Sequence, residues 1–471
     1  MSQDICFMDA VEMAAQIRAG HLSAREAVAA HLARIEAVNP RVNAIVTLHA
    51  EQALAAAAAA DEAQARNAPL GPLHGLPVAH KDLLPTAGMR TTYGSRIHER
   101  NVPAASALMV ERQRQAGAIS LGKTNTPEFG AGSQTFNALF GATRNPYDLD
   151  KTCGGSSGGS AVALATGMVA LADGTDMGGS LRCPANYCNV VGLRPSVGRV
   201  PNVPTIDGWG SLSVSGPMAR TVADLALYLS VMAGPDARDP LSIAEDGARF
   251  AGPLERDWKG ARIAWCPDLG GLPVDRQVLR AMEAQRTVFE QLGATVEEAC
   301  PDFRDAHDIF MALRAYSFEL NLGALMDHHP GVMKDTIVWN IEEGRRLTAP
   351  QLARAEKLRT ALFLRMHRFM QDYDFIVCAV NQAPPFDIGQ AYVTEIDGVK
   401  MENYIDWMRS CYYITVTTHP AISVPCGFTA EGLPVGLQIV GRHRGELELL
   451  QVAHAFEQAT QAGRRRPASI G

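Results

Sequence analysis

The chain has 471 residues and a formal net charge of −7 at pH 7. Hydrophobic residues make up 47% of the sequence and charged residues 20%, a balance typical of globular proteins with a sizeable buried core. The acidic balance argues against a general nucleic-acid binder, whose affinity requires a basic face, and it leaves small-molecule chemistry open.

Helical patterns fill the N-terminal part of the chain. Apolar positions recur at helical spacing over residues 8–18. Ser23 followed by Glu26 three positions later forms a capping box, which predicts a second helix that ends near Val38. The alanine-rich stretch at residues 51–66 predicts a third helix, because alanine is the best helix former.

Further along, strand and helix patterns alternate. The apolar run at residues 75–80 and the run at residues 118–125 are typical of strands, and residues 105–117 between them are typical of a helix. The same order recurs as a helix over residues 159–167 and a strand over residues 168–176. Such alternation favours an α/β sheet with helices packed against it.

Two strands and a closing helix are expected near the C-terminus, over residues 421–428, 433–441 and 445–460. Residues 234–258 are rich in Pro, Gly, Asp and Arg and predict a long surface connection. The segment from about 300 to 410 has the weakest pattern.

Cysteine usage and the N-terminal sequence bear on the cellular setting. The nine cysteines are scattered, odd in number and without a CxxC pair at metal spacing, which favours a reducing compartment. The first residues are acidic where a signal peptide is basic, and no apolar run reaches membrane-spanning length. We therefore expect a cytoplasmic protein that binds neither membrane nor nucleic acid.

The stretch "TCGGSSGGSA" at residues 152–161 concentrates glycine and serine. A linker is one interpretation, but an apolar helix pattern follows at once. A phosphate-binding loop would need a lysine and a preceding strand. "GGSSG" formally matches a nucleophile elbow, which also needs a buried strand before it. A serine presented between glycines, whose backbone can approach a substrate closely, stays open.

A second glycine-serine turn, "GTDMGGSLR" at residues 174–182, lies between an expected strand and an expected helix. Ser180 would sit there beside the amides of Met177, Gly178 and Gly179, and contiguous amides are what an oxyanion hole requires. An ordinary strand-to-helix turn is the alternative.

A nucleophilic serine needs a base, and Lys81 follows an apolar run that would bury its amine. Burial lowers a lysine pKa and makes the amine a usable base. The alternative is a structural charge paired with the adjacent Asp82. The histidines lack a partner motif and are interpreted as structural or surface residues: His74, His80, His328, His329 and His419.

Together these segments resemble the amidase signature family. The motifs are "GLPVAHKD", then "CGGSSGGSA" 75 residues after the lysine, then "GTDMGGSLR" 24 residues later. "GLRPSVGRVP", "GPMARTVADLAL" and "HPAISVPCGF…LPVGLQIVGR" are similar to its flanking segments. The resemblance covers most of the chain and is weakest from about 240 to 410.

The resemblance implies a Ser–cisSer–Lys triad. Ser180 would be the nucleophile and Lys81 the base, and Ser156 would bridge them after a cis Gly155–Ser156 peptide bond. No metal or organic cofactor is implied. The oxyanion would be held by the backbone amides of Met177, Gly178, Gly179 and Ser180.

Further residues are assigned supporting roles by the same resemblance. Ser157 and Asp176 would support the two loops through hydrogen bonds, and Arg182 would anchor a loop. The loop matching "FGAGS" would line the acyl side of the cleft. The expected substrate contacts are Gly130 and Ala131 of this loop, together with Ser156.

The implied fold is α/β: a single large domain over residues 1–471 with a central mixed β-sheet covered by helices on both faces. Residues 1–66 would form N-terminal helices, and residues 67–230 the signature core with the triad. Residues 231–410 would line the pocket and the periphery, and residues 411–471 would add the C-terminal strands and helix.

The expected reaction is hydrolysis of small amides through a Ser180 acyl-enzyme. Apolar and aromatic residues at 335–339, 375–380 and 391–414 suggest a large apolar pocket suited to aryl or acyl amides. Carbamates (urethanes) and esters present the same carbonyl and are further expected substrates. These aromatic residues could equally belong to the core.

Two other functions stay open. The first is the glutaminase subunit of a tRNA-dependent amidotransferase. In that subunit a basic segment would stand where this chain has Trp339 and Asn340. An acidic residue that binds glutamine would stand where this chain has Met408. The second is a catalytically silent binding module. The expected partner is a small amide or carbamate, and a homodimer is an open alternative to a monomer.

Overall fold

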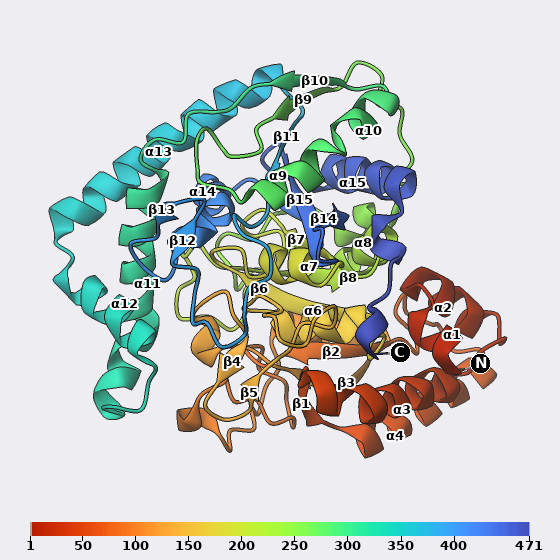
Figure 1. The fold of residues 1–471 in the computed structure, drawn as a ribbon. Helices are drawn as coiled ribbons and strands as arrows, with labels where there is room; N and C mark the ends of the chain where they lie inside the picture. The colour runs from red at the N-terminus through yellow and green to blue at the C-terminus, as the bar shows by residue number, and fades with distance from the viewer. Residues whose placement is uncertain (1, 471) are drawn as a thin grey trace.

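A computed structural model describes residues 2–470 and places a mixed β-sheet at its centre (Figure 1). Within that range the sheet has eleven strands. From one edge to the other they are β1 (Ile45–Leu48), β3 (Ile119–Thr124), β2 (Pro77–Lys81), β6 (Leu171–Asp176), β8 (Val214–Ala219), β7 (Val191–Arg194), β14 (Ala421–Phe428), β15 (Pro434–Gly441), β11 (Phe375–Ala379), β9 (Arg262–Trp265) and β10 (Thr295–Glu298). Two small hairpins lie outside it: β4 (Phe136–Asn137) with β5 (Gly141–Ala142), and β12 (Glu395–Ile396) with β13 (Val399–Lys400).

Helices surround the sheet. The N-terminal ones are α1 (Ser2–Phe7), α2 (Ala10–Arg18), α3 (Ala24–Val42) and α4 (Ala50–Ala65). Those of the middle are α5 (Leu108–Gln115), α6 (Gly158–Ala165), α7 (Arg182–Tyr187), α8 (Val222–Met232), α9 (Arg276–Glu283) and α10 (Arg286–Gln291). The remaining ones are α11 (Ala306–His328), α12 (Asp335–Arg346), α13 (Ala349–Asp372), α14 (Arg409–Thr417) and α15 (Glu446–Thr460), of which α11, α12 and α13 form a lobe at one side of the molecule (Figure 1).

Alternation along the strands explains why both faces of the sheet are covered. In β11, Phe375 and Val377 belong to a core shared with α8, α9 and α15, whereas Ile376 and Cys378 belong to a core shared with α11, α13 and α14. Successive side chains of a strand point to opposite faces, so each face carries its own apolar layer. The expected mixed sheet with helices on both faces is confirmed.

The elements expected from the sequence are present, with two differences: residues 1–66, expected to form helices, also contain strand β1, and one helix is longer than expected. Helix α3 continues through Pro40 to Val42 instead of ending near Val38. Pro40 has no backbone N–H to donate to the carbonyl four residues earlier, and the helix ends two residues after it. Asn39 then caps the end, because its side-chain oxygen accepts from the backbone amides of Ala44 and Ile45 at 2.9 and 2.8 Å.

One cysteine pair differs from what the expected reducing compartment implies. Cys266 and Cys300 are joined by a disulfide. Cys266 directly follows β9 and Cys300 lies just beyond β10, and these strands are parallel neighbours whose ends lie side by side. The other seven cysteines are free and buried. Over residues 2–470, no helix has both the length and the apolar character needed to cross a membrane.

Candidate active site

The topology brings the sequence motifs together at the carboxyl ends of two neighbouring strands. Lys81 is the last residue of β2 and Asp176 the last residue of β6. These strands are parallel neighbours, so their carboxyl ends meet. Helix α6, which begins directly after the first glycine-serine loop, packs against both strands.

The Lys81 amine lies in a cluster of hydroxyl groups. The side chain is fully buried, and Nζ donates to Ser156 Oγ at 2.7 Å, to Ser157 Oγ at 2.9 Å and to Thr175 Oγ1 at 2.9 Å. All three acceptors are neutral. Among residues 2–470, no carboxylate oxygen lies within 4.0 Å of this amine.

Burial lowers the pKa of Lys81 to about 7, although the negative charges of Asp176 and Asp173 oppose the shift. A large fraction of this lysine is therefore neutral at neutral pH. The alternative pairing with Asp82 is not present. The Asp82 carboxylate instead accepts from the Thr92 hydroxyl at 2.5 Å and from the Thr92 amide at 3.0 Å.

Sequence reasoning missed the residue that positions this lysine. The Asp173 carboxylate accepts from the Lys81 backbone amide at 2.8 Å and lies 2.6 Å from His80 Nδ1, and His80 Nε2 lies 2.7 Å from Ser120 Oγ. His80 is thus structural, as expected. The only sequence signal for Asp173 is an acidic residue that directly follows the apolar run at residues 168–172.

The first glycine-serine loop places two hydroxyl groups against the lysine. Its Gly155–Ser156 peptide bond is cis, as the family resemblance implies. Ser156 is 2% exposed and Ser157 is fully buried. The Ser157 amide donates to the Ser180 carbonyl at 3.2 Å, so the two loops are joined directly.

The second loop carries Ser180, which is 8% exposed, between β6 and α7. Four amides were expected to form the oxyanion hole. The Gly179 amide instead donates to Asp176 Oδ1 at 3.0 Å and is therefore occupied. The amides of Met177, Gly178 and Ser180 have no acceptor in the part of the chain that the structure describes, which makes them the available donors.

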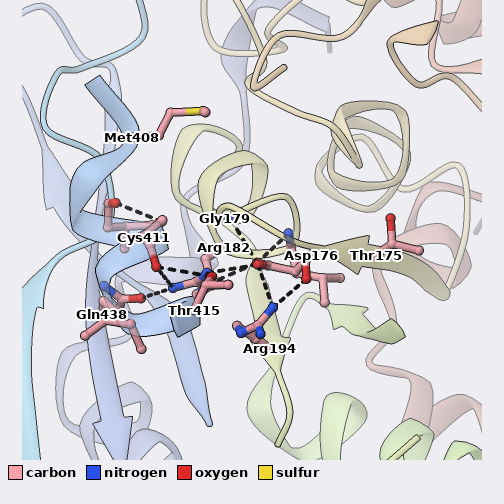
Figure 2. Close-up of polar contacts among 12 residues, drawn as sticks. Thr175, Asp176, Gly179, Arg182, Arg194, Met408, Cys411, Thr415 and Gln438 are labelled. Atoms are coloured by element: carbon pink, nitrogen blue, oxygen red, sulfur yellow. Dashed lines mark hydrogen bonds and ion pairs between the residues drawn. The ribbon is translucent and has the colours of Figure 1, made fainter. Parts of the chain in front are cut away.

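Asp176 holds this loop through a buried ion network (Figure 2). Arg182 contacts its two carboxylate oxygens at 2.9 and 3.0 Å, and Arg194 lies 3.2 Å from Oδ1. Burial alone would raise the pKa of Asp176, but the two guanidinium charges outweigh it and hold that pKa well below the usual range. Arg182 also donates to Cys411 O, Thr415 Oγ1 and Gln438 Oε1, which makes it a loop anchor.

A cleft of about 100 Å³ brings the predicted catalytic serines together. It is lined by Ser156, Ser180, Thr175, Met177, Gly178, Gly130, Phe129, Phe318, Arg314 and Met408, among others. Ala131 is not among the residues that line this cleft, and its side chain packs in an apolar cluster with Phe318 and Ile337, so its contact with substrate stays a prediction.

A larger cavity of about 530 Å³ adjoins this cleft, and its walls include Leu83, Phe129, Met177, Ser213 and Phe318 of the inner cleft. Its other aromatic side chains are Tyr93, Trp209 and Tyr316. The aromatic stretches expected to line the pocket mostly form core instead, since Trp407 and Tyr412 are buried against α11 and α13. The cavity is lined by aromatic side chains, but these come from other segments than the ones expected.

Comparison with known proteins agrees with this geometry. The profile of the family described as Amidase matches residues 26–450. An acylamidase from Rhodococcus erythropolis is 38% identical over 99% of this chain and 98% of its own length. One of the glutamyl-tRNA(Gln) amidotransferase subunits, from Synechococcus sp. (strain CC9605), is 36% identical over 96% of both chains. The crystal structure of a bacterial aryl acylamidase of the amidase signature family superposes with a TM-score of 0.93, at 29% identity and 99% coverage of both chains.

We expect Asp176→Asn to destabilise the fold by about 3–5 kcal/mol, because two buried guanidinium groups lose their counter-charge. Urea denaturation followed by circular dichroism measures the change. The matched control is Glu343→Gln, which breaks an exposed 2.7 Å ion pair with Arg346 and should cost less than about 1 kcal/mol. Equal effects of the two substitutions would contradict the role given to Asp176.

Proposed function

This chain belongs to the amidase family and hydrolyses amide C–N bonds, and we propose that it does so as a free-standing acylamidase with Lys81, Ser156 and Ser180 as catalytic residues. One observation carries the assignment of roles. A fully buried amine, with its pKa lowered to about 7, lies 2.7 Å from the hydroxyl of Ser156. A neutral amine in that position is a general base poised for proton transfer.

The proposed reaction is a two-step acyl transfer. Neutral Lys81 accepts the proton of Ser156, which accepts the proton of Ser180 as Ser180 Oγ attacks the carbonyl carbon. The free amides of Met177, Gly178 and Ser180 are placed to stabilise the resulting oxyanion. The relay then returns a proton to the nitrogen as the C–N bond breaks. Water attacks the acyl-enzyme by the same route and releases the acid.

The walls of the two cavities support acyl and aryl amides as substrates. The walls of the larger cavity combine apolar and aromatic side chains with polar ones, among them Asp207, Glu356 and Arg359, and the apolar part suits an aryl or extended acyl group. The names of the acylamidase from Rhodococcus erythropolis and of the aryl acylamidase point the same way. Carbamates and esters, which carry the same carbonyl, complete the proposed substrate range.

The glutaminase subunit is the second candidate, because a relative with an amidotransferase name aligns over nearly the whole chain. Recognition of glutamine requires an acid for the ammonium group. Met408 lines the cleft and contacts Ser133 Oγ, and the lining of the inner cleft includes no acidic side chain among the described residues. This composition favours the acylamidase. A cytoplasmic location and homodimer formation stay predictions.

We expect the wild-type enzyme to hydrolyse an anilide and an aryl carbamate, and Ser180→Ala to lose at least about 10³-fold in kcat because no other group can form the acyl-enzyme. Release of amine from a panel of anilide, aliphatic amide, aryl carbamate, ester and glutamine measures this. The control is Ser230→Ala. Ser230 lies on α8, its hydroxyl donates to Leu227 O, and it lines neither cavity. Turnover of glutamine alone would favour the amidotransferase subunit.

The pH profile tests the base. Because Lys81 acts when deprotonated, kcat/KM should rise as the pH passes about 7 and level off above it. Lys81→Ala should lower kcat by about 10²–10⁴-fold and abolish this inflection.

Lys123 provides the matched control. Burial also lowers its pKa, to about 8, but its amine donates to Leu84 O and Thr86 Oγ1 and not to Ser156. Lys123→Met should therefore keep the inflection near pH 7. A wild-type rate that falls as the pH rises would refute the proposed proton relay.

A further inference from the structure

A buried cation other than Lys81 faces the inner cleft. Arg314, on α11, is 5% exposed and lines the same cleft as Ser156 and Ser180. It comes from a different part of the fold than the catalytic groups, since its element belongs to the lobe of α11, α12 and α13 (Figure 1).

The contacts of this guanidinium are all with uncharged groups. Nε donates to Asn340 Oδ1 at 3.1 Å, Nη2 to Tyr404 Oη at 2.9 Å, and Nη1 lies 3.4 Å from Met177 Sδ. The Phe318 ring centroid lies 4.5 Å from Cζ. Among the side chains that the structure describes, those of residues 5–470, no carboxylate forms an ion pair with Arg314.

These contacts orient the cation without neutralising it. A guanidinium has five N–H donors, and the three contacts use three of them, one on a thioether that is a weak acceptor. Removing a cation from water costs several kcal/mol unless an anion or good acceptors replace the water, and neutral acceptors with an aromatic face do so only in part. A fixed, unpaired guanidinium matches the geometry of a carboxylate, which it binds in bidentate fashion.

The described lining of the inner cleft has no negatively charged side chain. Its described lining includes one cation, Arg314, and no aspartate or glutamate. Met408 contacts Ser133, so that part of the cleft presents a thioether. An acyl group with a carboxylate would find a partner here, whereas an ammonium group would be buried without one.

We propose that Arg314 binds a carboxylate on the acyl group of the substrate, so that the preferred amides are monoamides of short dicarboxylic acids. This inference rests on the proposed acylamidase function. In the reaction the C–N bond breaks, the amine leaves with a proton from the relay, and water supplies the hydroxyl of the new acid. The carboxylate on Arg314 is unchanged.

The test compares kcat/KM for the monoanilides of malonic, succinic and glutaric acids with kcat/KM for butyranilide, a neutral analogue of the succinic compound. We expect at least one dicarboxylic monoanilide to be preferred by about tenfold or more, as one charge-assisted contact allows. Arg314→Met should reduce this preference ratio by about tenfold, mainly through KM, and Arg314→Lys should restore part of it.

Two controls separate a specific contact from other effects. Arg112→Met removes another partly buried cation, whose Nη1 donates to Met232 O and Gly234 O, and should leave the preference ratio unchanged. Inhibition of the wild-type enzyme by succinate compared with butyrate needs no variant. Succinate should inhibit about tenfold more strongly if Arg314 binds the second carboxylate.

The outcomes distinguish this inference from the proposed function. Hydrolysis of butyranilide without preference for any dicarboxylic monoanilide, or a ratio unchanged by Arg314→Met, overturns the inference and leaves the acylamidase intact. Faster turnover of glutamine than of the monoanilides overturns the exclusion of an ammonium group. Failure to hydrolyse any of these amides removes both proposals.

Discussion

A buried amine without a carboxylate partner is the constraint on which the rest of this site depends. Lys81 is surrounded by the hydroxyls of Ser156, Ser157 and Thr175, and these neutral groups cannot offset the loss of hydration of a charged amine. The pKa of Lys81 therefore falls to about 7. The end of β2, the loop before α6 and the end of β6 must meet at one point to produce this environment, and the parallel pairing of β2 with β6 makes them do so.

Asp176 lies close enough to Lys81 to influence the charge of its amine, but the fold keeps the two groups from forming an ion pair. The charge of Asp176 raises the pKa of Lys81, which a direct ion pair would raise further. Arg182 and Arg194 bind the Asp176 carboxylate instead, and the Gly179 and Leu181 amides complete its hydrogen bonds (Figure 2). The ion network around Asp176 thus stabilises the turn that carries Ser180. The Lys81 amine and its hydroxyl partners remain available for proton transfer.

The sequence predicts those parts of the site that lie within short, regular motifs. Lys81, Ser156 and Ser180 stand in glycine-rich or apolar segments whose spacing is recognisable, and the alternation of strands and helices predicts the sheet. Asp173 and Arg314 escape such reasoning, because neither lies in a recognisable motif and the partners of each come from distant segments. The burial of Ala131 escapes sequence reasoning for the same reason, since the cluster around it includes residues of α12.

The proposed catalytic residues and the proposed substrate-binding residues come from different parts of the chain, and Arg182 contacts both parts. The proposed catalytic groups lie between residues 81 and 180, whereas Arg314 and Met408 come from α11 and from the turn before α14. Arg182 binds Asp176 on one side and Cys411 O and Thr415 Oγ1 of α14 on the other. The ion network that holds the Ser180 turn therefore also fixes the helix that follows Met408. Arg314 touches the Ser180 turn through the Met177 thioether and makes no contact with Asp176 or Arg182, so a substitution there changes the charge of the cleft while the ion network keeps its own contacts.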